Sequence, residues 1–219
     1  SLPRDPFAHR VHIGVSGFFN YDILTARKPD FTVLLDICPQ TQLIHQIASA
    51  CMKRALRPAD FVDAFISKVK KTTSLAGCFF EPKSSEAAIR AELLRKNSWL
   101  SQLDSYRYIQ SLDKTDRILI TRGDLLHRET IAKIQLWMST YRLSLDTFYI
   151  ANCGDPIWTE RPLPFNRNLQ IPIEEPRIFY RTIKPLIQPA TYVIDSSTEL
   201  FLSQRIYRIG LDLNDDATL

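Results

Sequence analysis

The sequence has no run of apolar residues that approaches the roughly 18 residues of a membrane-spanning helix. Internal repeats and low-complexity tracts are also missing, which excludes a solenoid or another repeat array. We therefore expect no membrane span and a globular fold.

Cysteine is scarce, and its placement is equally informative. The four cysteines form no C-x-x-C pair, and none has a histidine at the spacing of metal ligands, so no metal site is expected. Cys38 and Cys51 lie among apolar neighbours, as buried free thiols do. Free thiols suit a reducing compartment, so the sequence predicts a cytoplasmic protein. The cysteines are Cys38, Cys51, Cys78 and Cys153.

The composition is that of a globular protein with a sizeable core. Of 219 residues, 45% are apolar, 24% are charged and 11% are aromatic. The net charge of +4 weakly favours anionic partners and does not select nucleic acid. The length suits one large domain or two small ones, and we expect a single α/β domain over residues 1–219.

The strongest functional signal lies in the first 40 residues. The apolar run 11–15 meets a small-residue turn, Gly14 to Gly17, and about twenty residues later a second apolar run ends in Asp36. This is the layout of the first βαβ unit of a nucleotide-binding sheet. The turn lets a ligand approach the backbone, and an acid at the tip of the second strand can hold the two hydroxyls of a ribose.

Strand and helix patterns alternate along most of the chain, which predicts a doubly wound, mostly parallel, Rossmann-like α/β sheet. A helical insert over about residues 58–113 interrupts this alternation. The last strand alternates apolar and polar residues, as an antiparallel edge strand does. The expected strands are 11–15, 31–37, 117–121, 147–151, 191–194 and 204–213. The expected helices are 21–27, several within 40–112, 130–138 and 177–187, and a proline-rich loop covers 156–172.

Four segments in this order resemble a class I S-adenosylmethionine-dependent methyltransferase. They are the turn 14–17, the strand-two acid with its proline at 35–39, the acid-bearing turn 122–124, and the pieces 146–152, 183–186 and 191–195, which look like strand four, a Lys-Pro turn and strand five. The resemblance spans about residues 11–213. It implies S-adenosylmethionine as cofactor and methyl transfer to an unknown acceptor: a protein, a small molecule or RNA.

The resemblance also implies a set of site residues. The turn would approach the methionine part, Asp36 would hold the ribose, Asp124 would accept from the adenine amine, and Asp155 and Trp158 would belong to an acceptor pocket. No catalytic base is predicted. The implied cofactor-binding residues are Gly14, Ser16, Gly17, Asp36, Ile37, Gly123, Asp124 and Asn152.

The chain departs from the family pattern around the turn. His12 stands where the family has an acid, and Ser16 and Phe18 stand where it has glycines. The general look, an aberrant glycine turn with a large helical insert, also resembles methyltransferase-like proteins of bacterial pathogens. A catalytically inactive binding or effector protein, acting in a host cytoplasm, is therefore one alternative. A NAD-dependent oxidoreductase is another, although it expects a fuller G-x-G-x-x-G.

Each site residue has a structural alternative. Asp36 or Asp124 would then cap the helix that follows it, and the glycines would serve only tight packing. Asn152, Asp155 and Trp158 would start a loop with an exposed aromatic.

Several further residues are expected to be structural. His12 is predicted to be a core histidine, and His45 and His127 to have surface or capping roles. Trp99 is predicted to lie in the core of the insert. A solvated helix end is predicted at Lys68, Lys70 and Lys71.

Overall fold

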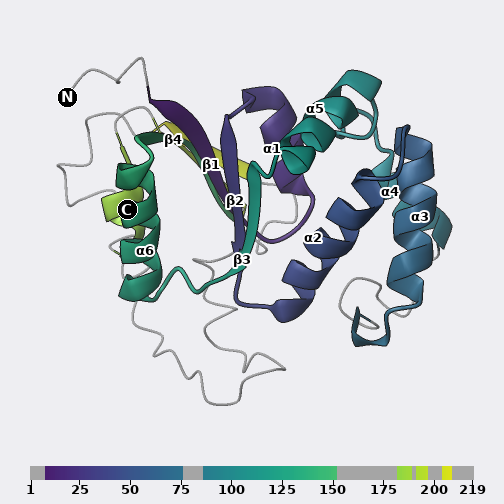
Figure 1. Cartoon of the computed structure of the whole chain (residues 1–219), viewed down its shortest axis with the longest axis horizontal. Coiled ribbons are helices and arrows are strands. Elements are labelled where there is room, and N and C mark those ends of the chain that lie inside the picture. Colours follow the sequence, from purple (N-terminus) through teal and green to yellow (C-terminus); the bar gives the residue numbers. More distant parts are fainter. Residues whose placement is uncertain (1–7, 76–85, 152–181, 189–190, 197–203, 209–219) are drawn as a thin grey trace. The chain divides into compact units, whose positions relative to one another are not determined.

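Parallel strand pairs and flanking helices give the chain an α/β, Rossmann-like fold, which confirms the predicted fold class. The computed structural model describes residues 8–75, 86–151, 182–188, 191–196 and 204–208 (Figure 1). The chain forms two compact units. We call residues Ser16–Arg122 the central unit, and Ser1–Val15 with Gly123–Leu219 the split unit. The single domain expected over 1–219 stays a prediction.

The split unit is built on β1, which pairs in parallel with β4, while β4 pairs in parallel with β5. Val11, Ile13 and Phe148 are fully buried. β6 pairs with β5 in antiparallel register, and the predicted edge strand up to residue 213 stays a prediction. The elements are β1 (His9–Val15), α6 (Arg128–Thr140), β4 (Leu143–Ala151), the 3-10 turn η2 (Lys184–Leu186), β5 (Tyr192–Ser196) and β6 (Gln204–Arg208).

The central unit pairs β2 with β3 in parallel, from Thr32 opposite Ile118 to Asp36 opposite Arg122. The predicted insert range contains only helices in its described part, and α2 and α3 pack side by side (Figure 1). The elements are α1 (Phe19–Arg27), β2 (Phe31–Asp36), α2 (Pro39–Met52), α3 (Pro58–Lys70), η1 (Thr73–Leu75), α4 (Glu86–Leu93), α5 (Leu103–Lys114) and β3 (Ile118–Arg122).

Proline sets the starts of two helices in this unit. Pro39 and Pro58 occupy the first turn of α2 and α3, where a missing N–H costs nothing and the fixed φ favours the helix. Pro58 therefore starts a new helix after α2 has ended at Met52. α1 ends at Lys28, whose φ of 50° is left-handed.

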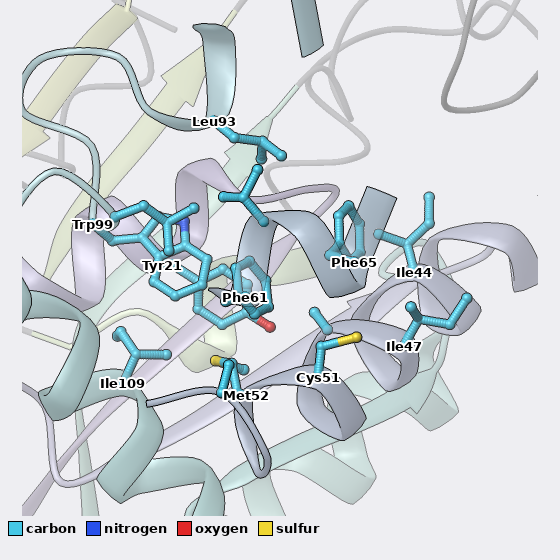
Figure 2. Close-up of a cluster of buried hydrophobic side chains, with 14 of the residues drawn as sticks. Tyr21, Ile44, Ile47, Cys51, Met52, Phe61, Phe65, Leu93, Trp99 and Ile109 are labelled. Carbon is cyan, nitrogen blue, oxygen red and sulfur yellow. The ribbon is translucent and has the colours of Figure 1, made fainter. Parts of the chain in front are cut away.

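Aliphatic and aromatic side chains together form the buried core of the central unit (Figure 2). Its aromatic cluster consists of Tyr21, Phe61, Phe65, Trp99 and Tyr106. Trp99 is 1% exposed, and its ring centroid lies 4.8 Å from that of Tyr21 and 5.2 Å from that of Phe61. The predicted core role of Trp99 is confirmed. The lysines of the predicted solvated helix end are all exposed: Lys68, Lys70 and Lys71.

The two described cysteines differ in burial. Cys51 is a buried free thiol, as predicted. Cys38, the N-cap residue of α2, is only half-buried, so its predicted burial is wrong. Cys78 and Cys153 lie outside the described residues, as do the loop 156–172 and most of the predicted helix 177–187. Within the described residues, the end of this predicted range forms the 3-10 turn η2.

No helix in the described ranges combines the length and apolarity that crossing a membrane requires. Within the same ranges, no cluster of three or more His, Cys, Asp or Glu side chains is arranged to hold a metal ion.

Candidate cofactor site

The turn at Ser16 and Gly17 leads into α1 and is tied to the end of β2 by one carboxylate. The Ser16 N–H donates to Oδ2 of Asp36 at 3.2 Å, and the Cys38 N–H donates to Oδ1 at 2.8 Å. Asp36 therefore joins the turn to the start of α2. The structure brings together four predicted site residues in the central unit: Ser16, Gly17, Asp36 and Ile37.

The carbonyl side of the turn is held by two side chains. His45 Nε2 donates to the Ser16 carbonyl at 2.8 Å, and Asn20 Nδ2 donates to the Gly17 carbonyl at 2.9 Å. Asn20 Nδ2 also lies 3.4 Å from the Ser16 carbonyl oxygen. Both peptide groups that flank Gly17 are therefore held by hydrogen bonds to their carbonyl oxygens.

His45 is a buried neutral histidine with a defined tautomer. A carbonyl oxygen only accepts, so Nε2 carries the hydrogen, and Nδ1 accepts from the Tyr21 hydroxyl at 3.1 Å. Burial lowers the pKa of His45 from 6.5 to about 4, although its bond to Ser16 acts in the opposite direction. The expected surface or capping role is wrong, because His45 is 2% exposed and lies in the middle of α2, where it caps neither end.

Ser16 and Phe18, which stand where the methyltransferases that the sequence resembles have glycines, differ in their structural setting. Ser16 has a φ of 69°, the left-handed conformation that favours glycine. The Phe18 ring packs edge-on against Phe65 at 5.1 Å and against His45 at 5.9 Å between centroids. Phe18 thus anchors the turn to the aromatic cluster, which a glycine could not do.

The conformation of Ser16 gives a first prediction. We expect Ser16→Gly to be more stable than Ser16→Ala by about 0.5–1 kcal/mol, because alanine keeps the unfavourable left-handed side chain while glycine does not. Urea unfolding followed by circular dichroism measures the difference. A glycine variant less stable than the alanine variant would contradict the left-handed conformation.

The surface beside the turn is open and partly apolar. A Cβ built on Gly17 meets no atom within 4 Å, so ligand atoms could come close to this backbone. Ile37, directly after Asp36, is 37% exposed although it is a large apolar residue. An exposed apolar side chain next to a carboxylate fits a ligand with a flat apolar part and hydroxyl groups.

Burial and hydrogen bonding have opposite effects on the pKa of Asp36. Burial is the largest effect and raises the pKa of Asp36, while hydrogen bonds from Cys38, Ser16, Thr41 and Ile37 act to lower it. A carboxylate has about four lone-pair sites, so these four hydrogen bonds fill them, and a ligand hydroxyl would replace the one side-chain donor, Thr41. Asp36 thus precedes α2 and accepts the N–H of Cys38, the N-cap residue of that helix, but it is not the N-cap itself.

The remaining predicted residues belong to the split unit. Gly14 is buried in β1 opposite Tyr149 of β4. Gly123 and Asp124 precede α6, and Asp124 Oδ1 accepts the Leu126 N–H at 2.8 Å. The N-cap alternative for Asp124 is wrong, because the N-cap residue of α6 is His127.

His12 and His127 agree with their predictions, and the predicted acceptor pocket lies outside the described residues. His12 is fully buried and its Nδ1 lies 2.7 Å from Thr147 Oγ1, which confirms a satisfied core histidine. His127 is exposed at the start of α6, as expected for a surface or capping residue. The predicted residues Asn152, Asp155 and Trp158 lie outside the described residues.

A family comparison covers most of the chain. Residues 8–77 and 79–204 match the family described as Domain of unknown function (DUF7790). The chain belongs to this family. No curated protein matches it. The matched residues include the whole described part of the central unit on both sides of residue 78, so the turn at Ser16, Asp36 and His45 all lie within the family match.

Sequence reasoning missed three residues of the site: Asn20, Tyr21 and His45. Asn20 could have been found, since an amide three residues after Gly17 at a helix start is placed to reach back to the turn. Nothing in the sequence links His45 to Ser16, because their contact depends on how α2 packs against α1.

Proposed function

We propose that the chain is an S-adenosylmethionine-dependent methyltransferase whose acceptor is a protein, a small molecule or RNA. The observation that carries this proposal is the turn at Ser16 and Gly17, which is tied to Asp36 and leaves the Gly17 backbone open. A turn before a helix and an acid at the end of the next strand are the two parts that bind a nucleoside ligand in open α/β sheets.

The residues present fit this cofactor. In the proposed complex Asp36 accepts the ribose hydroxyls, the Gly17 backbone lies against the methionine part, and Ile37 offers its exposed side chain to the adenine. Gly14, Gly123, Asp124 and Asn152 complete the proposed set by the family resemblance. When bound, S-adenosylmethionine supplies an activated methyl group, and the chain's own part is to position the acceptor for direct displacement.

The open space at Gly17 gives a second prediction. We expect Gly17→Ala to keep the free energy of unfolding within about 0.5 kcal/mol of the parent, because the new methyl group meets no protein atom. The same methyl group would occupy the approach of the ligand, so we expect the dissociation constant for S-adenosylhomocysteine to rise about tenfold or more. Titration calorimetry measures the binding, and urea unfolding measures the stability.

The control for this experiment is Asp60→Asn, an exposed carboxylate of the same unit that pairs with Arg57. It should bind the ligand like the parent, whereas Asp36→Ala should lose binding. No heat from the parent with S-adenosylmethionine or S-adenosylhomocysteine at high concentration would overturn the proposal. Saturable binding of NAD alone would favour the oxidoreductase.

A catalytically inactive binding protein is the second candidate. Asp36 already accepts backbone N–H groups from Ser16, Cys38 and Ile37, so the carboxylate has a structural task without any ligand. In that case the helical insert would dock a partner. The free thiols of Cys38 and Cys51 suit the cytoplasm, including a host cytoplasm for a secreted bacterial effector.

A further inference from the structure

A chain of directed hydrogen bonds runs from the interior of the central unit to the turn. The Tyr21 hydroxyl donates to His45 Nδ1, and His45 Nε2 donates to the Ser16 carbonyl. Tyr21 is fully buried and His45 is 2% exposed, so water does not replace these partners. Each group in the chain has its donor or acceptor role set by the next.

The direction of these hydrogen bonds determines which side of the Ser16–Gly17 peptide group faces outward. In a trans peptide the C=O and the N–H point in opposite directions. The Ser16 carbonyl points to His45, so the Gly17 N–H points away from His45. Gly17 is also the residue at which an added Cβ would meet no atom within 4 Å. The Ser16–Gly17 peptide therefore directs a donor away from the interior.

A flipped peptide would conflict with the interior. The Gly17 N–H would then face His45 Nε2, which already carries a hydrogen. His45 could accept that N–H only by moving its own hydrogen to Nδ1, and the Tyr21 hydroxyl would lose its acceptor in a fully buried position. Tyr21 thereby selects the tautomer of His45, and the tautomer selects the direction of the peptide.

We infer that His45, oriented by Tyr21, is a positioning residue that holds the Ser16–Gly17 peptide with its N–H toward the bound ligand. That a ligand binds here rests on the proposed function, whereas the direction of the peptide rests on the hydrogen bonds of His45. The residues that carry the inference come from α1 and α2, and neither is part of the glycine turn itself.

The test compares four variants with the parent by three measurements. They are His45→Ala, His45→Gln, Tyr21→Phe and the control Tyr106→Phe, which also removes a fully buried hydroxyl, one that donates to the Ala55 carbonyl at 3.0 Å. The measurements are the ring-nitrogen chemical shifts of His45, hydrogen exchange of the Ser16 and Gly17 amides, and calorimetric binding of S-adenosylhomocysteine.

We expect the parent to show hydrogen on Nε2 of His45. His45→Ala and Tyr21→Phe should raise the dissociation constant for S-adenosylhomocysteine about tenfold and speed exchange of the Ser16 amide. Glutamine can still donate to the Ser16 carbonyl, so His45→Gln should restore most of the binding lost in the alanine variant. Tyr106→Phe should bind like the parent although it is also less stable.

Two results would overturn the inference. One is a parent with hydrogen on Nδ1 of His45. The other is a Tyr21→Phe variant whose amide exchange and binding equal those of the parent. If the parent binds no S-adenosylhomocysteine, the proposed function fails, and the chemical shifts and amide exchange still decide the direction of the peptide. If His45→Ala does not fold, Tyr21→Phe, which changes one atom, carries the test.

Discussion

Replacing Trp99 with alanine lowers the free energy of unfolding by about 3–5 kcal/mol, the largest expected effect of a single substitution in this chain. Trp99 is 1% exposed, and its ring packs against those of Tyr21, Phe61 and Tyr106, which come from three different helices. Alanine would leave a large cavity where these helices meet; Figure 2 shows the Trp99 ring beside Tyr21.

The main-chain bond at this position should survive the substitution. The Trp99 N–H donates to Asp22 Oδ1 at 2.7 Å, and alanine keeps that N–H, so the expected loss is one of packing. Urea unfolding followed by circular dichroism measures it.

A matched control is Trp137→Ala. Trp137 is half-buried on α6, and its ring lies 6.4 Å from that of Tyr141, which is 62% exposed. We expect this variant to lose about 1 kcal/mol or less. Equal losses at the two tryptophans would mean that Trp99 does not occupy the core of the central unit.

Stability should fall in mild acid because of His45. Its pKa is about 4 in the folded chain and 6.5 when unperturbed. Between these values the unfolded chain binds more protons than the folded one, so the free energy of unfolding rises with pH. The contribution of neutral His45 to the free energy of unfolding has its full value of about 3 kcal/mol above pH 6.5. It is lost as the pH falls toward 4.

Two carboxyl groups of the central unit have the opposite effect on how the free energy of unfolding changes with pH. Burial raises the pKa of Asp22 and of Asp36, so from their ordinary values up to their raised values the folded chain binds more protons than the unfolded one. Their contribution to stability therefore falls as the pH rises through that window. Both carboxyl groups are present in every histidine variant, so a difference between variants isolates His45.

The experiment is urea unfolding of the parent and of His45→Gln from pH 4 to pH 7. The parent should gain about 3 kcal/mol relative to the variant over this range. Tyr106→Phe should run parallel to the parent, because the pKa of Tyr106 is raised to about 12 and lies outside this range. A difference between parent and His45→Gln that stays constant with pH would contradict a buried neutral His45.

The elements around the turn could be predicted because their signals are local. The apolar run that forms β2 ends in Asp36, and Pro39 follows at the first turn of α2. The stop of a strand and the start of a helix each depend on a few neighbouring residues. The position of Asp36 beside the turn followed from these signals and from the parallel order of a βαβ unit.

The chemistry of the turn could not be read from the same residues. The Phe18 ring packs against Phe65 and Trp99, and these residues lie far along the chain from it. His45 is neutral because α2 is packed so that its ring is buried. Burial and partners of this kind depend on long-range packing, which short-range sequence patterns do not encode.

By itself, the sequence determined the α/β order of elements, the helix starts at prolines and the carboxylate at the end of β2. The tertiary structure alone decided that His45 and Asn20 hold the carbonyls of the turn, that Ser16 takes a left-handed conformation and that Gly17 faces open space. The physical reason is that periodicity and turn propensity act within a few residues, whereas the direction of a buried hydrogen bond depends on every group packed around it.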